Sequence, residues 1–286
     1  MGETISKAEK KQAKQLKING RITEIDVLRG VAIALVILDH FMYDVFYLMP
    51  NIFGITRYDA GFWADLAALA RSYWFWNVRR IVRQAVLFTF LSLTGASCSL
   101  SRSNMKRSFK LLLLALGLTV ATVIADAVAG LKGRMIIVFG ILHMMAVSLI
   151  IISLMEKFSV DKWAYLIVGA IMVFAGRMFY DPLVPNMQQY VDTSVFFKQL
   201  WLAVTGQILL GPDSYSLLYY GGQIFIGVFL GKLLYPEKKS LLFKKGYKRN
   251  VLTFMGRHTL IVYLAHQIII PVLLGVALLL SGYTLS

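Results

Sequence analysis

Ionisable side chains are concentrated in the first long apolar run of this chain of 286 residues. They are Glu24, Asp26, Arg29, Asp39, His40 and Asp44. If the run is a helix, positions 26, 29, 33, 37 and 40 are three or four residues apart and share one face. Ionisable groups inside an apolar helix are costly, which makes them candidates for function. His40 could exchange a proton near neutral pH, and Asp39 and Asp44 lie close to it in the sequence.

Asp26 and Arg29 lie near the start of this run, where we expect them to pair. One interpretation is an ion pair that anchors the helix end at the membrane surface. The other is a binding site, because an arginine suits phosphate or amide oxygens. His40 lies about 16 Å farther along the helix axis than Arg29.

Three further histidines occur later in the chain. His143 and His266 lie within apolar runs, where each either bonds a neighbouring helix or touches a ligand. His258 follows Arg257 at an expected helix start, which favours a cap or a phosphate neighbour. No two histidines have the i, i+4 spacing of a metal-binding helix, so we expect no metal. The single Cys98 excludes an internal disulfide and a cysteine-rich metal site.

The elements that position these residues are predicted to be membrane-spanning helices. Hydrophobic residues make up 58% of the chain and charged residues 16%, and the mean hydropathy is +0.66. A soluble domain is nearer half apolar and a quarter charged. We therefore predict an all-α polytopic transmembrane bundle of about seven spans, with interfacial or re-entrant helices in addition. The expected spans are 26–48, 84–101, 109–130, 135–155, 163–180, 215–235 and 256–281.

Two further stretches are harder to assign. The apolar run 195–210 is only about 24 Å long as a helix, so it is expected to be re-entrant, interfacial or an eighth span. Residues 61–83 mix tryptophan with arginine, which is typical of an interfacial helix.

Small residues four positions apart predict two close helix contacts. The pairs are Gly95 with Ser99 and Gly227 with Gly231. Because such pairs also arise by chance, we interpret them as packing positions without a role in chemistry.

Positive charge predicts the orientation of the chain, whose formal net charge is +15. Lysine and arginine gather in cytoplasmic loops. With the N-terminus inside, the cytoplasmic pieces hold 20 Lys and Arg and the external pieces hold 9. We expect a multi-pass protein of the cell membrane with an external C-terminus. Its parts would be a basic cytoplasmic segment, 1–25, and a single transmembrane domain, 26–286, with the basic segment 232–257 inside; an eighth span would place that segment outside.

Several segments resemble known transmembrane acyltransferases. Residues 21–32 read RITEIDVLRGVA, and ten residues separate Arg29 from His40. This is similar to the R-x10-H element of the acyltransferase-3 proteins, which O-acylate surface polysaccharides. Other segments resemble the bacterial relatives of the heparan-alpha-glucosaminide N-acetyltransferase catalytic domain. These are residues 39–44, 90–97, 140–143 and 256–267.

The resemblance implies acyl transfer across a membrane. Acetyl-CoA would be the cytosolic co-substrate, and a sugar or glycan would present an amine or hydroxyl from the other side. His40 would be the general base or acyl carrier, with Asp39 and Asp44 beside it. The residues implied in binding CoA or the acceptor are Asp26, Arg29, His143, Arg257, His258, His266 and Gln267. The implied partners are acetyl-CoA, the sugar or glycan acceptor and the lipid bilayer, without nucleic acid; a homodimer stays open.

Two other functions fit the same residues. A transporter or proton-coupled carrier would use the same buried histidine, aspartate and arginine side chains, and a non-catalytic membrane subunit is a third interpretation. The segment 232–257 would either hold CoA phosphates or anchor the chain on anionic lipid. Binding or hydrolysis of acyl-CoA discriminates a transferase from the other two.

Overall fold

The computed structural model describes residues 22–55, 59–101, 103–181, 188–242 and 250–284. Most of the expected basic segment 1–25, and part of the basic segment 232–257, lie outside these residues. The chain divides into two compact units, which are described separately here. Unit 1 comprises residues 1–90 and 238–286, and unit 2 comprises residues 91–237.

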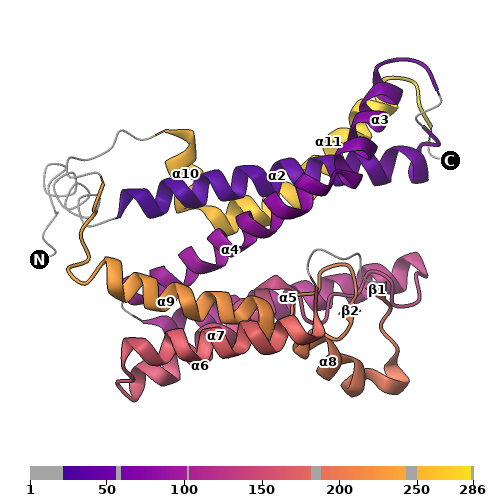
Figure 1. Ribbon diagram of the computed structural model, residues 1–286. Coiled ribbons are helices and arrows are strands. Elements are labelled where there is room, and N and C mark those ends of the chain that lie inside the picture. Colours follow the sequence, from indigo (N-terminus) through magenta and orange to yellow (C-terminus); the bar gives the residue numbers. More distant parts are fainter. Residues whose placement is uncertain (1–21, 56–58, 102, 182–187, 243–249, 285–286) are drawn as a thin grey trace, which may run out of the picture. The chain divides into compact units, whose positions relative to one another are not determined.

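Within the described residues, six helices are long and apolar enough to cross a membrane (Figure 1). They are Thr23–Ile52, Asn77–Leu100, Asn104–Val128, Lys162–Phe179, Leu217–Leu234 and Thr259–Leu280. A seventh apolar helix, α6 (Ile141–Lys157), has 17 residues, about 25 Å, which is the lower end of the spanning range. The predicted all-α polytopic bundle is therefore confirmed, and each of the seven expected spans corresponds to one of these helices.

In unit 1, helix α2 packs against three other helices. The helices of this unit are α2 (Thr23–Ile52), α3 (Phe62–Phe75), α10 (Val251–Arg257) and α11 (Thr259–Leu280), together with the first half of α4 (Asn77–Leu100). Helices α2 and α10 cross closely, because a Cβ added at Gly30 would collide with the Leu252 backbone and one at Gly256 would collide with the Asp26 backbone. Helix α10, which directly precedes α11 in the chain, therefore packs on the first turns of α2.

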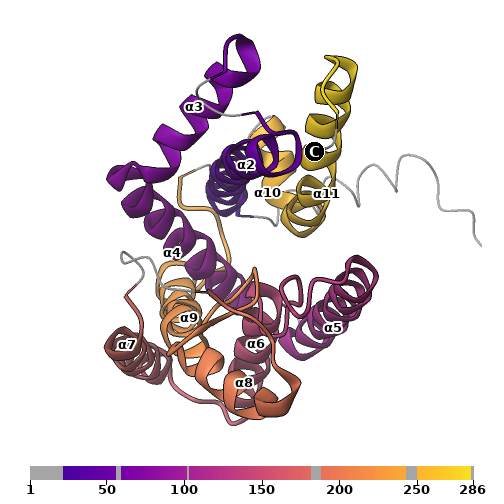
Figure 2. The same ribbon diagram turned by 90° about the vertical axis from the view of Figure 1, so that its right-hand side faces the viewer.

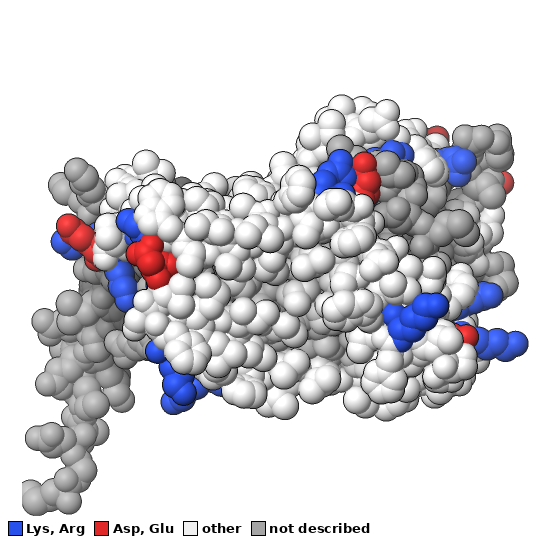
Figure 3. Space-filling view, turned by 60° about the horizontal axis from the view of Figure 1, so that its bottom comes forward, with Lys and Arg blue, Asp and Glu red and all other residues white. Residues whose placement is uncertain are grey.

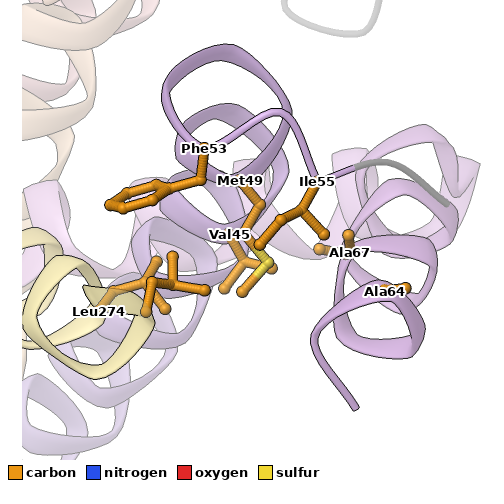
Figure 4. Packing of buried hydrophobic residues seen from close by; sticks show 9 residues of the cluster. Val45, Met49, Phe53, Ile55, Ala64, Ala67 and Leu274 are labelled. Atoms are coloured by element: carbon orange, nitrogen blue, oxygen red, sulfur yellow. The ribbon is translucent and has the colours of Figure 1, made fainter. Parts of the chain in front are cut away.

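An apolar cluster joins the far end of α2 to α3 and α11 (Figure 4). Val45, Met49 and Phe53 come from α2 or the residue after it, and Leu274 comes from α11. The alanines of α3 leave room for these larger side chains, and Ala67 lies in the cluster. The cluster therefore fixes the end of α2 that follows His40.

Unit 2 is a helical bundle built from the remaining elements. Its helices are the second half of α4, α5 (Asn104–Ala129), α6, α7 (Lys162–Phe179), α8 (Phe196–Thr205) and α9 (Gly222–Leu234), with the short turns η1 (Thr193–Val195) and η2 (Leu217–Gly221). Helix α6 packs against α5 and α9, and it lies between them in Figure 2. The two-residue strands β1 (Gln188–Gln189) and β2 (Leu209–Leu210) pair in parallel.

The predicted small-residue pairs meet each other in unit 2. A Cβ added at Gly95 would collide with the carbonyl of Ile224, and one at Gly227 would collide with the backbone of Ser92. A Cβ at Gly231 would lie 2.6 Å from the Ser99 hydroxyl oxygen. Helices α4 and α9 therefore cross backbone to backbone at the positions where both helices carry small residues.

The structure corrects the expectation for residues 61–83 and removes one of the alternatives for residues 195–210. Residues 61–83 are not one interfacial helix, because Trp76 has an extended conformation that ends α3, and α4 begins at Asn77. Three arginines of this stretch, Arg79, Arg80 and Arg83, therefore belong to the first turns of α4. Within 195–210 the helix α8 has 10 residues, about 15 Å, and ends at Gly206 with a φ of 95°. That length excludes an eighth span there.

Charged side chains are unevenly distributed over the surface. In Figure 3 the Lys, Arg, Asp and Glu side chains gather toward the two ends of the view, and the broad area between them shows none of these residues. Such a face suits the hydrocarbon core of a bilayer.

Candidate active site

His40 and His266 meet in unit 1, on α2 and α11. Their ring centroids are 4.8 Å apart, and the rings are nearly perpendicular, at 83°. His266 is buried, at 5% exposure, while His40 is half-buried. The structure thus brings together two predicted site residues that are 226 positions apart in the sequence.

Both imidazoles bond to carbonyls of their own helices. His40 Nδ1 lies 2.9 Å from the Val36 carbonyl oxygen, and His266 Nδ1 lies 3.2 Å from that of Val262. Because a carbonyl oxygen only accepts, each Nδ1 carries the hydrogen, which assigns the lone pair of the neutral ring to Nε2. The Nε2 atom of His266 is buried and has no hydrogen-bond partner among the described residues. The pair therefore presents two nitrogens that can accept a hydrogen bond or a proton.

Asp39 points to a different neighbour from His40. Its carboxylate accepts two bonds from Arg79, at 2.7 Å from Nε and 2.9 Å from Nη2. The Tyr73 hydroxyl donates to the same carboxylate at 3.1 Å, and the Nε atom of Arg83 lies 3.8 Å away. Burial raises the pKa of the Tyr73 hydroxyl, and the negative charge of Asp39 adds to the rise, so the phenol stays a donor. The group that orients the His40 ring here is the Val36 carbonyl.

Asp44 and Gln267 lie close to the histidine pair along the chain. Asp44 is one turn beyond His40 on the same face of α2 and is half-buried. Asp44 makes no hydrogen bond or ion pair with the part of the chain that the structure describes. Gln267 directly follows His266 and is half-buried as well.

The polar residues predicted near the start of α2 are joined to α10. Arg257 Nε lies 2.9 Å from Asp26 Oδ2, and both side chains are largely buried. Arg29 is half-buried one turn farther along α2. His258 is exposed and packs beside the ring of Phe254, at 4.8 Å between centroids.

Glu24 is a buried carboxylate that sequence reasoning noticed and did not assign to the site. It accepts hydrogen bonds from the Ser240 hydroxyl and from the Leu241 backbone N–H, the latter at 2.6 Å. Glu24 and Asp26 thus fasten residues before and after the segment 243–249 to the first turn of α2. The sequence signal was two acidic residues in one first turn, which alone does not name their partners.

His143 lies in unit 2, where it joins two helices. Its Nε2 atom is 3.1 Å from the Thr119 hydroxyl oxygen, and that hydroxyl donates to the Ile137 carbonyl at 2.7 Å. His143 Nε2 therefore donates, and Nδ1 holds the lone pair. That Nδ1 atom is buried without a hydrogen-bond partner among the described residues.

The arginine and aromatic residues around Asp39 were not predicted as part of the site. Arg79 is buried, at 8% exposure, and its guanidinium carbon lies 3.6 Å from the centroid of the Trp74 ring. The clustering of tryptophan and arginine was visible in the sequence, but it was interpreted as an interfacial anchor. In the residues that the structure covers, no group of three or more His, Cys, Asp or Glu side chains could hold a metal ion.

Comparison with known families gives one match. A family model described as heparan-alpha-glucosaminide N-acetyltransferase, catalytic, matches residues 21–268. The match includes His40 and His266 and runs through both units. No curated protein and no solved structure gives a significant match.

Proposed function

Because the chain belongs to the family of heparan-alpha-glucosaminide N-acetyltransferase catalytic domains, we propose that it transfers an acetyl group from acetyl-CoA to the amine of a sugar or glycan acceptor. The observation that supports this most directly is the pair His40 and His266, whose Nε2 atoms are both left as acceptors. The chain is a multi-pass membrane protein. We place it in the cell membrane, as one acyltransferase domain over residues 26–286.

In the proposed reaction His40 Nε2 is the base. The acceptor nitrogen forms a bond to the acetyl carbonyl carbon, and the thioester carbon–sulfur bond breaks. Nε2 takes a proton from the amine and gives it to the sulfur of the departing thiolate, so the ring ends in its starting form. An alternative with a transient acetyl-imidazole uses the same lone pair, and both routes need Nδ1 to hold its hydrogen as it does on the Val36 carbonyl.

His266 gives a reason to favour an amine over a hydroxyl. Its Nε2 atom is a buried acceptor that lacks a partner among the described residues, which is unfavourable until a donor arrives. A primary amine has two N–H donors, one for each imidazole, whereas a hydroxyl has one. The family is that of an N-acetyltransferase, which agrees with this choice.

The start of α2 is the proposed CoA side. Arg29 lies about 16 Å from His40 along the axis of α2, which is comparable to an extended pantetheine arm. Asp26 and Arg257 hold α10 against this end, next to His258. With a cytoplasmic N-terminus, CoA phosphates would meet Arg29, Arg257, His258 and the basic segment 232–257 on the side where acetyl-CoA is made.

The test is acetyl transfer by the purified protein. Labelled acetyl-CoA is incubated with and without glucosamine, and the label is followed into product and into protein. We expect transfer by the wild type and a loss of about 10²–10⁴-fold in His40→Ala, the usual contribution of a general base. His266→Ala and His143→Ala should lose less, and Asn51→Ala, an exposed change on the same helix as His40, should be unaffected.

Two results would contradict the proposal. Near-normal turnover of His40→Ala beside an inactive His143 or His266 variant would move the chemistry away from the first span. A wild-type protein that neither binds nor consumes acetyl-CoA would favour a carrier.

A further inference from the structure

The corner between α3 and α4 holds the turn of α2 that carries His40. Arg79 forms two parallel bonds with Asp39, at 2.7 and 2.9 Å, and the side chains are 8% and 17% exposed. The Tyr73 hydroxyl donates a third bond to Asp39 at 3.1 Å. Two-pronged bonds of this kind between a guanidinium and a carboxylate fix direction as well as distance.

A second contact lies farther along the same helix. The Arg79 guanidinium rests over the Trp74 ring at 3.6 Å, and Trp74 in turn stacks on Phe46, with centroids 5.6 Å apart and planes at 10°. Tyr43 also packs against Trp74, at 4.9 Å. Asp39, Tyr43 and Phe46 are spaced four and three residues apart, so they form one face of α2. The corner therefore holds this face both before and after His40.

Holding this face fixes where His40 points. Successive residues of a helix are about 100° apart around its axis, so His40 is offset by that angle from Asp39. A rotation of α2 would carry His40 away from His266, which belongs to α11 and lies 4.8 Å away between ring centroids. The pairing with Arg79 also neutralises the carboxylate that directly precedes His40 in the chain.

We propose that Arg79 is a positioning residue for the acetyl transfer, which holds α2 through Asp39 so that His40 faces His266. The role of Arg79 in acetyl transfer rests on the proposed function, whereas its role in orienting α2 does not. Lysine is a poor replacement, because a point charge supplies neither the two-pronged bond nor the flat surface that stacks on Trp74.

The first measurement is steady-state acetyl transfer to glucosamine by Arg79→Gln and Arg79→Lys. We expect kcat to fall about 10–100-fold in both, as misplaced catalytic groups do, while KM for acetyl-CoA stays within about twofold. The matched control is Arg71→Gln in the same corner, because Arg71 is exposed and rests over a ring, Phe75 at 5.3 Å. It should turn over like the wild type.

The second measurement reports geometry without any chemistry of transfer. In a Cys98→Ser background, His40→Cys and His266→Cys are combined and oxidised with copper phenanthroline. Cross-linking should be several-fold slower with Arg79→Gln or Arg79→Lys than with the wild-type arginine at position 79 or with Arg71→Gln. If the Arg79→Gln protein does not accumulate in membranes, both the kinetic and the cross-linking measurement are made with Arg79→Lys alone.

The outcomes separate the two proposals. Slower cross-linking together with lower kcat supports the positioning role. Unchanged cross-linking overturns it, whether kcat falls or not, because Arg79 would then act without orienting α2. A wild type without any transfer activity removes the proposed function, and the cross-linking rates still decide whether Arg79 orients α2.

Discussion

His40 is oriented by a group on its own helix. The carbonyl four residues earlier, of Val36, fixes the hydrogen on Nδ1, and His266 repeats the arrangement with Val262 on α11. The sequence instead suggests Asp39 or Asp44, which are close to His40 in the chain, as the orienting group. Asp39 is next to His40 in the chain, but adjacent helical residues point about 100° apart, and Asp39 meets Arg79 instead.

Arg29 is the residue on which we expect acetyl-CoA affinity to depend. Arg29→Ala should weaken acetyl-CoA binding about 10–100-fold, the worth of a charged hydrogen bond. Arg29→Lys should be nearly as weak, since an ammonium cannot reproduce the planar fork. Isothermal titration calorimetry on detergent-solubilised protein would measure both, with Arg177→Gln, half-exposed and paired with Asp181 in unit 2, as the control. Affinity unchanged in both Arg29 variants would exclude Arg29 from the CoA path.

At the scale of elements, the small-residue pairs in the sequence lie where two helices, α4 and α9, contact each other. The sequence marked positions on α4 and α9 where backbones can approach, and the structure places Gly95, Gly227 and Gly231 at that crossing. The spacing alone did not say that the two pairs face each other. The break at Trp76 was not predictable either, because residues 61–83 have no proline or glycine between Gly61 and Arg83 to mark where one helix ends.

Bulk at the α4–α9 crossing should destabilise the protein. Gly227→Val would force a side chain into the backbone of Ser92, and overpacking of this kind costs about 1–3 kcal/mol. Gly117→Ala on α5 is the matched control, because nothing lies within 4 Å of the added Cβ. That change should be neutral or stabilise by up to about 1 kcal/mol, the difference in helix propensity. Thermal unfolding in detergent measures both; equal melting temperatures for the two variants would contradict the close crossing.

At the scale of the whole molecule, the number of crossings decides which side each terminus faces. The described residues include six long apolar helices and the shorter α6, and if all seven cross the bilayer the two termini lie on opposite sides. Composition predicted the helical membrane class, because apolar runs of about 20 residues have few other uses. Pairs between distant residues, such as Asp26 with Arg257, depend on tertiary packing that a single sequence does not contain.

Cysteine accessibility should establish this orientation. In a Cys98→Ser background, a membrane-impermeant maleimide applied to intact cells should label Thr284→Cys near the C-terminus. Lys239→Cys, in the basic segment 232–257, should react only after the cells are permeabilised. The reverse pattern would invert the topology and remove the cytoplasmic CoA side. Labelling of both positions in intact cells would exclude an odd number of crossings between them.

The bond between His40 Nδ1 and the Val36 carbonyl has a consequence for the energy balance of the cell. An imidazole conducts protons along a chain by receiving one on one nitrogen and releasing another from the opposite nitrogen. With Nδ1 committed to the helix, protons enter and leave His40 through Nε2 alone, and the same restriction holds for His266. If His40 is the base, as proposed, it would work turnover after turnover without conducting protons through the bilayer and dissipating the proton gradient.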